Sequence, residues 1–148
     1  MRLQQWAANG WLRPHQTTPQ QIADLLAIVE RDLLDSAREL SPDWQFGIAY
    51  NATLKLCTIL LYASGYRPEK NLAHYRTLQA LPLILGSKFA NDADYLDACR
   101  AKRNTAEYDT VGTVSQSEAD ELRDFTRELQ TAVLAWLRKN HPSLIISP

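Results

Sequence analysis

The sequence predicts an all-α protein, an up-and-down bundle of four to five long helices with a short N-terminal extension. Apolar residues recur at helical spacing in several long segments, and no segment shows sustained alternation of apolar and polar residues. Gly and Pro punctuate the chain between these segments. The 148 residues suit one domain, for which we expect an extension at 1–17, a bundle at 18–140 and a tail at 141–148.

Two consecutive start signals predict the first pair of long helices. Thr18-Pro19 offers an N-cap followed by proline at the first helical position, and the apolar stripe after it continues to about Leu40. Ser41-Pro42 repeats the signal for a helix to about Ala63, which ends in an expected loop at Gly65–Pro68. Because this second helix is apolar on most sides, we expect it to be the central one. Its polar strip consists of Asn51, Lys55, Thr58 and Tyr62.

Similar signals predict the remaining helices. A helix over about Leu72–Leu85 is interrupted by its own proline, which removes a backbone hydrogen bond. The next helix spans roughly Lys88–Asp109. The last one follows a serine cap, Ser115 or Ser117, and ends at about Asn140.

Composition and cysteine usage exclude several functional classes. With 16 basic and 17 acidic residues the net charge is -1, so any binding of nucleic acid or nucleotide must be local. Cys57 and Cys99 lie far apart without a CxxC, which suits a reducing cytosol. The apolar run Leu54–Ala63 is too short and too polar to cross a bilayer, and the N-terminus lacks a secretory signal. We expect a cytoplasmic protein that contacts no membrane.

Aromatic residues and histidines give weaker signals. The four tryptophans are too scattered to predict a ligand cage, so core packing or a subunit contact is their default role. The three histidines lack the spacing of metal ligands, and no motif indicates a metal site or a cofactor. His74 beside Tyr75 is most simply an exposed helix start.

The segment Lys88–Asp109 carries the strongest indication of chemistry. On a helical wheel, at about 100° per residue, charged residues near its end fall on the same arc as its apolar residues. Guanidinium groups keep their charge and are seldom buried without partners, so this cluster needs an explanation. The candidate site residues are Arg100, Arg103, Asn104, Glu107, Tyr108 and Asp109.

Two interpretations of this cluster stay open. In the structural one, Arg103 pairs with Glu107 at i+4, and Arg100 pairs with Asp97 or with a neighbouring helix. In the functional one, the cluster lines a groove, where Arg103 clamps a phosphate with its planar fork and Asn104 donates further hydrogen bonds. An arginine at such a site also stabilises the charge that develops on a phosphoryl group during cleavage.

Four short motifs carry a resemblance to a known family. They are Arg103-Asn104 with Tyr108-Asp109, Ala49-Tyr50-Asn51-Ala52, Gly65-Tyr66-Arg67, and the segment Arg31–Ala37. Together they resemble the HEPN (higher eukaryote and prokaryote nucleotide-binding) superfamily over roughly Thr18 to Leu137. The last segment looks like the bacterial branch in which a HEPN protein stands alone or beside a nucleotidyltransferase.

The resemblance implies a helical bundle that forms a homodimer, acts in toxin-antitoxin or defence systems, and has a nucleotidyltransferase-type antitoxin as partner. Many members are metal-independent endoribonucleases that use an Arg, a polar residue and, four to six positions later, a His. Arg103 and Asn104 match this motif, but Tyr108 stands in place of the His. An unperturbed tyrosine titrates near pH 10 and is a poor general base, so we rank binding above cleavage.

Three functions follow. In the first, the cluster binds RNA or a nucleotide phosphate, and Asn51 satisfies polar groups between helices or reaches the cleft. In the second, the chain is a metal-independent endoribonuclease toxin with Arg103 and Tyr108 as catalytic residues, and His74 is the spare proton carrier if the fold brings it to Arg103. In the third, the chain is a non-catalytic adaptor and the cluster is a structural salt bridge.

Overall fold

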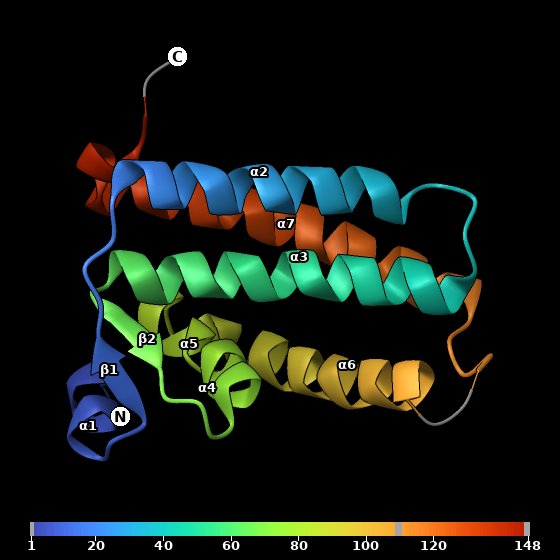
Figure 1. The fold of residues 1–148 in the computed structure, drawn as a ribbon, viewed down its shortest axis with the longest axis horizontal. Helices are drawn as coiled ribbons and strands as arrows, with labels where there is room; N and C mark the ends of the chain where they lie inside the picture. Colours follow the sequence, from blue (N-terminus) through green and yellow to red (C-terminus); the bar gives the residue numbers. More distant parts are fainter. Residues whose placement is uncertain (1, 109–110, 147–148) are drawn as a thin grey trace.

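The computed structural model describes residues 2–108 and 111–146, with the side chains of 107 and 108 excepted, and the chain is mostly helical. The all-α class is therefore confirmed. The long helices are α2 (Pro19–Ser36), α3 (Pro42–Ala63), α6 (Ala90–Tyr108) and α7 (Gln116–Asn140). In Figure 1, α2 and α7 lie on one side of α3 and α6 lies on the other. The colours show that α3 runs opposite to both α2 and α6.

Helix α3 is the centre of the fold, as predicted. It packs against α2, α6 and α7 and also against α4 (Ala73–Gln79) and α5 (Leu81–Leu85), the pair predicted as one interrupted helix. Most of its side chains are buried, and the polar strip that begins at Asn51 is half-buried. Among the described residues, α3 is the helix that is long and apolar enough to span a membrane, but most of it is buried within the fold.

Hydroxyl caps set the start of three long helices. Thr18 caps α2, Ser41 caps α3 and Ser115 caps α7, each accepting a hydrogen bond from the backbone N–H three residues further on. In α7 the Glu118 side chain completes a capping box. These starts agree with the sequence prediction, which left only Ser117 open as an alternative.

Helix α2 ends at Ser36, whereas its apolar stripe predicted an end near Leu40. The Ser36 hydroxyl donates to the carbonyl of Leu33 at 2.8 Å, and the Gln45 amide donates to the carbonyl of Arg38 at 2.7 Å. These bonds stabilise the turn that reverses the chain into α3. Leu40 lies in this turn and is 41% exposed.

The N-terminal segment pairs with the segment that was predicted to be a loop. Helix α1 (Leu3–Ala8) leads into β1 (Leu12–Pro14), which pairs antiparallel with β2 (Tyr66–Pro68). Three-residue strands are too short to show an alternating pattern, which is why the sequence did not predict them. Trp6 packs here with Leu61 of α3 in a second core cluster.

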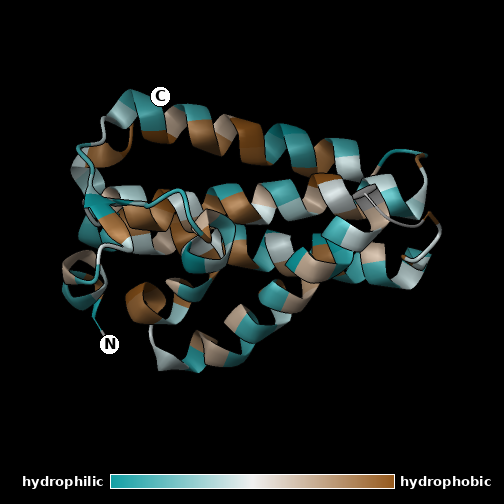
Figure 2. Cartoon of the chain, turned by 60° about the horizontal axis from the view of Figure 1, so that its bottom comes forward, coloured by the Kyte–Doolittle hydropathy of each residue, from teal (hydrophilic) through white to brown (hydrophobic). Residues whose placement is uncertain are grey.

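The main core lies between α2, α3, α6 and α7. The outer helices carry both hydrophilic and hydrophobic residues, as expected of amphipathic helices (Figure 2). Cys57 and Cys99 are buried thiols in this core. At one end of this core, α2, α3 and α6 leave a hollow between them.

Candidate functional site

A hollow of about 370 Å³ lies between α2, α3 and α6. This volume is within the roughly 300–1,000 Å³ range of small-molecule pockets. Because α3 and α6 run in opposite directions, the start of α3 lies beside the end of α6 (Figure 1). The lining comes from α2 (Asp32), from α3 and its cap (Ser41, Asp43, Trp44, Gly47, Ile48, Asn51), from α6 (Arg103, Ala106) and from the following loop (Val111).

Arg103 borders this hollow from α6. Its guanidinium carbon lies 5.7 Å from the centre of the Tyr50 ring, and its Nη1 donates to Asn104 Oδ1 at 3.2 Å. The side chain is half-buried. An aromatic face and an amide oxygen both favour the guanidinium, so they hold Arg103 at the wall of the hollow.

Two further ionisable side chains, His74 and Tyr50, feel the charge of Arg103. The His74 ring lies 6.4 Å from the Tyr50 ring. Partial desolvation and the charges of Arg103, Lys55 and Arg100 lower the pKa of His74 below its usual value. Burial raises the pKa of Tyr50 to about 12, against the opposing effect of Arg103 and Arg100. The fold thus places both His74 and Arg103 near the Tyr50 ring.

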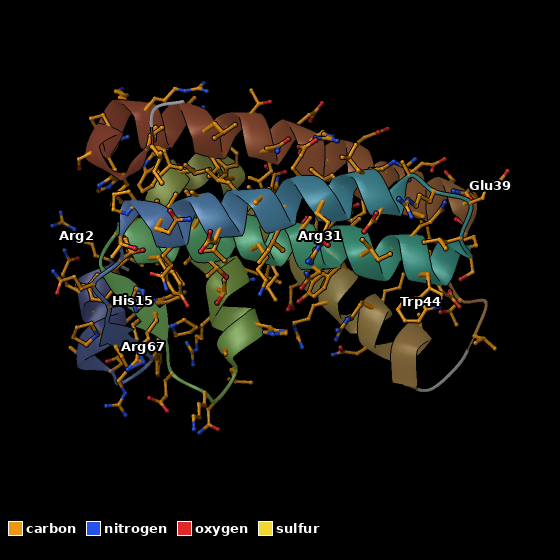
Figure 3. The ribbon with its side chains drawn as sticks, turned by 45° about the horizontal axis from the view of Figure 1, so that its top comes forward. Arg2, His15, Arg31, Glu39, Trp44 and Arg67 are labelled. Atoms are coloured by element: carbon orange, nitrogen blue, oxygen red, sulfur yellow. The ribbon has the colours of Figure 1, made fainter. Side chains whose placement is uncertain are left out.

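Asn51 connects α3 to a buried carboxylate on α2. Its Nδ2 donates to Asp32 Oδ2 at 2.6 Å, and Arg31 Nε donates to Asp32 Oδ1 at 3.0 Å. Asp32 is only 6% exposed, and a carboxylate so buried requires such partners. Figure 3 shows Arg31 on α2. Asn51 therefore satisfies polar groups between helices and also borders the hollow, which are the two roles the sequence left open.

Asp43 fastens the loop before α7 to the start of α3. Its two carboxylate oxygens accept hydrogen bonds from the backbone N–H groups of Gly112 at 2.7 Å and of Val114 at 3.2 Å. Gly112 has a φ of +78°, a conformation that favours glycine. The loop carries Val111 to the rim of the hollow, where this side chain is 87% exposed.

Arg100 has the partner that the structural interpretation assigned to it. Its Nε donates to Asp97 Oδ1 at 2.8 Å, and its guanidinium carbon lies 5.9 Å from the Tyr75 ring centre. Both members of the ion pair are about one-third exposed, so solvent screens the pair and it stabilises the helix little. Arg100 lies outside the described lining of the hollow, and its charge acts on His74 and Tyr50.

Several predicted members of the site lie outside the described residues. This is the case for the side chains of Glu107 and Tyr108 and for all of Asp109. Their predicted roles, including the pair between Arg103 and Glu107, stay predictions. Within residues 2–108 and 111–146, no group of three or more His, Cys, Asp or Glu is arranged to hold a metal ion.

Sequence reasoning missed part of the lining. Asp32 lies three residues after Val29, on the buried stripe of α2, and an acid on an apolar stripe is the signal that could have indicated it. Trp44 and Asn51 are seven residues apart, which places them on one face of α3. Because this face meets α6 only in the folded chain, no local pattern indicated that it borders a hollow.

The chain matches no family model, and neither a curated protein nor a solved structure matches it at a significant level. Any functional assignment therefore depends on the residues of the chain itself.

Proposed function

We propose that this chain is a HEPN-like protein whose hollow binds a phosphate group of RNA or of a nucleotide, with Arg103 as the anchor. The observation that carries the proposal is the position of Arg103 on the wall of a 370 Å³ hollow that Asn51 also borders. A guanidinium presents several N–H donors in a planar fork that matches two phosphate oxygens. An arginine in a concave site is therefore suited to hold a phosphate.

The charges around the hollow support this proposal. Arg103, Lys55 and Arg100 all lie close enough to His74 for their charges to lower its pKa. They gather three positive charges in one region of a protein with a net charge of -1. The acids of the lining, Asp32 and Asp43, already accept hydrogen bonds from protein donors, which reduces their repulsion of an anion.

The proposal includes the architecture and setting that the family resemblance implies. The chain is then an up-and-down bundle of four to five long helices, and the alternating directions of α2, α3, α6 and α7 in Figure 1 support this. It is a cytoplasmic homodimer and a toxin-antitoxin or defence component, with a nucleotidyltransferase-type antitoxin as partner. Sedimentation of the purified chain, alone and with such a protein, tests the assembly.

Binding of RNA tests the phosphate site. Fluorescence anisotropy with a labelled short RNA in EDTA compares the wild type with Arg103→Gln and with Arg127→Gln. Arg127 is the matched control, because it is a partly exposed arginine of α7 that pairs with Glu30 outside the hollow. We expect Arg103→Gln to weaken binding by at least about tenfold, as the loss of a charge-assisted phosphate contact predicts.

The salt dependence of the same binding reaction separates the alternatives. Affinity should fall with rising salt, and Arg103→Gln should make this dependence shallower, because one phosphate contact is lost. Equal binding by the two variants would contradict the proposal. A protein that binds neither RNA nor a nucleotide, and that loses stability on Arg103→Gln, would fit the adaptor function instead.

A metal-independent endoribonuclease is the second candidate, and the position of His74 favours it. A lowered pKa keeps the imidazole neutral near pH 7, as a general base requires. The 2′-hydroxyl would lose its proton to His74 and attack the adjacent phosphorus, while the bond to the 5′-oxygen breaks. The products would be a 2′,3′-cyclic phosphate and a 5′-hydroxyl, whose oxygen takes its proton from water, and the His74 imidazolium would return its proton to the hydroxide so formed. Arg103 would stabilise the charge on the phosphoryl oxygens.

Cleavage of RNA in EDTA tests the enzyme function. We expect His74→Gln and Arg103→Gln each to lower the rate by about 10²-fold or more, in line with the loss of a proton carrier or of a charge-stabilising group. Arg127→Gln should cut like the wild type. If Arg103→Gln cuts as fast as the wild type, the cleavage does not come from this site.

A further inference from the structure

Trp44 differs from the other tryptophans because its side chain is 63% exposed. Trp6 is buried, Trp11 stacks under the guanidinium of Arg76 at 3.6 Å, and Trp136 packs against the main core. Burial of apolar surface stabilises a protein by roughly 25 cal/mol per Å², and an indole ring that stays in water lacks this stabilisation. Trp44 therefore presents a large aromatic surface that a ligand can cover, and it does so at the edge of the hollow.

The backbone of Trp44 is held in place by local hydrogen bonds. Its N–H donates to the Ser41 hydroxyl, which caps α3, and the preceding Asp43 binds two backbone N–H groups of the loop before α7. Figure 3 shows Trp44 at the start of α3, on the side where α6 ends. A ring on a fixed helical turn loses little entropy when a ligand stacks on it.

One end of the hollow presents the Trp44 ring, with Ser41 and Asp43 beside it, and the other end presents Arg103. Along α3, Trp44 and Ile48 precede Asn51, and Trp44 and Asn51 are about 10 Å apart along the helix axis. Helix α6 runs the other way, so Ala106 lies toward the Trp44 end and Arg103 toward the Asn51 end. A nucleotide has the same division, with a flat base on one side of its ribose and a phosphate on the other.

We propose that Trp44 stacks on an unpaired nucleobase whose phosphate is held by Arg103. This inference rests on the proposed function and narrows its ligand to a nucleotide or single-stranded RNA. Bases in a duplex are already stacked on each other, whereas an unpaired base offers its face to an aromatic side chain. Trp44 is thus the residue that distinguishes a base-bearing ligand from a bare phosphate backbone.

A comparison of two single-stranded oligonucleotides tests the role of Trp44. One is a short single-stranded RNA of mixed sequence, and the other is an abasic strand with the same number of phosphates. We expect Trp44→Ala to weaken binding of the RNA about 5- to 150-fold, which corresponds to the ~1–3 kcal/mol of one stacked base. Binding of the abasic strand should not change. Trp44→Phe should restore most of the affinity for RNA, because phenylalanine also presents an aromatic face.

Leu34→Ala is the matched control, since Leu34 is a large apolar residue that is 59% exposed and lies on α2 outside the lining. It should bind both strands like the wild type, and circular dichroism checks that each variant is folded. Competition with a nucleoside monophosphate identifies the source of the base. Competition as strong as that of the RNA supports a free nucleotide as ligand, and much weaker competition supports an RNA chain.

Three results would overturn the inference, and they are distinguishable. If Trp44→Ala binds RNA like the wild type while Arg103→Gln loses both strands, Trp44 stacks on no base but the phosphate site stands. If Trp44→Ala alters the oligomeric state and leaves RNA binding unchanged, the ring belongs to a contact between copies of the chain. If the wild-type protein binds neither strand nor the nucleotide, the proposed function fails as well.

Discussion

Arginine and tryptophan come together at both ends of the molecule, but in opposite ways. At the clamped end, formed by α1, β1, β2 and α4, the Arg76 guanidinium lies 3.6 Å from the Trp11 ring centre and 5.8 Å from that of Trp6. At the open end, Trp44 and Arg103 border the same hollow. Closed contacts of this kind hold the N-terminal segment on the bundle, whereas an open arrangement leaves room for a ligand.

The largest expected effect concerns stability at the clamped end. Trp6 is 7% exposed and packs with Leu12, Leu61 and Ala80. Trp6→Ala should lower the free energy of unfolding by about 3–5 kcal/mol, because it leaves a cavity. Urea denaturation measures this change. Trp44→Ala at the open end should cost less than about 1 kcal/mol, and similar losses for both variants would remove the contrast between the two ends.

A change within the open end should move stability and affinity in opposite directions. Asp32→Asn removes a negative charge from the hollow but disturbs the hydrogen bonds from Asn51 and Arg31. We expect the free energy of unfolding to fall by about 1–3 kcal/mol, and RNA to bind about 2- to 5-fold more tightly. Denaturation and anisotropy on the same sample measure both. Weaker RNA binding by the folded variant would mean that Asp32 assists the ligand and does not repel it.

A smaller change in stability is expected for Gly47→Ala, and its sign tests whether the space beside Gly47 is open. It lies within α3, and a Cβ atom built there meets nothing within 4 Å. Because glycine is a poor helix former, Gly47→Ala should stabilise the protein by about 0.5–1 kcal/mol. Thermal unfolding measures the gain. Destabilisation would indicate that the site is more tightly packed than the structure shows.

The smallest effect is a pH dependence from His74. Its pKa in the folded protein is lowered from 6.5, so the unfolded chain takes up this proton more readily. The contribution of this group is fully present above pH 6.5 and is lost as the pH falls from there through the folded pKa. His74→Gln should therefore show a weaker decline in melting temperature below pH 6.5 than the wild type. Parallel curves would mean that the surrounding positive charges do not act on His74.

The helices could be predicted because their signals are local. A hydroxyl at Thr18, Ser41 or Ser115 and the apolar stripe that follows are enough to place a helix start. The errors occurred where distant segments meet. The end of α2 depends on the turn into α3, and β2 depends on pairing with β1, which the residues of Tyr66–Pro68 do not reveal by themselves.

In the candidate site too, residues with a local signal could be predicted and residues that depend on distant segments could not. Arg103 could be predicted because a guanidinium on an apolar stripe is unusual in any helix, and Asn51 because it lies on the polar strip of an otherwise mostly apolar helix and in a motif of the family resemblance. Trp44 and Asp32 could not be assigned to the site in this way. They join it only because α2 and α6 lie on either side of the start of α3, an arrangement set by packing across the whole bundle.

The most direct test of the phosphate site is nuclear magnetic resonance of the arginine side chains during titration with a nucleoside monophosphate. A guanidinium that binds phosphate shifts its Nε–H resonance, because the new hydrogen bond changes the environment of that proton. We expect a saturable shift for Arg103, accompanied by the indole N–H of Trp44, and no shift for Arg127. If the Arg103 resonance stays in place, or if all arginines shift alike, the hollow does not hold the phosphate.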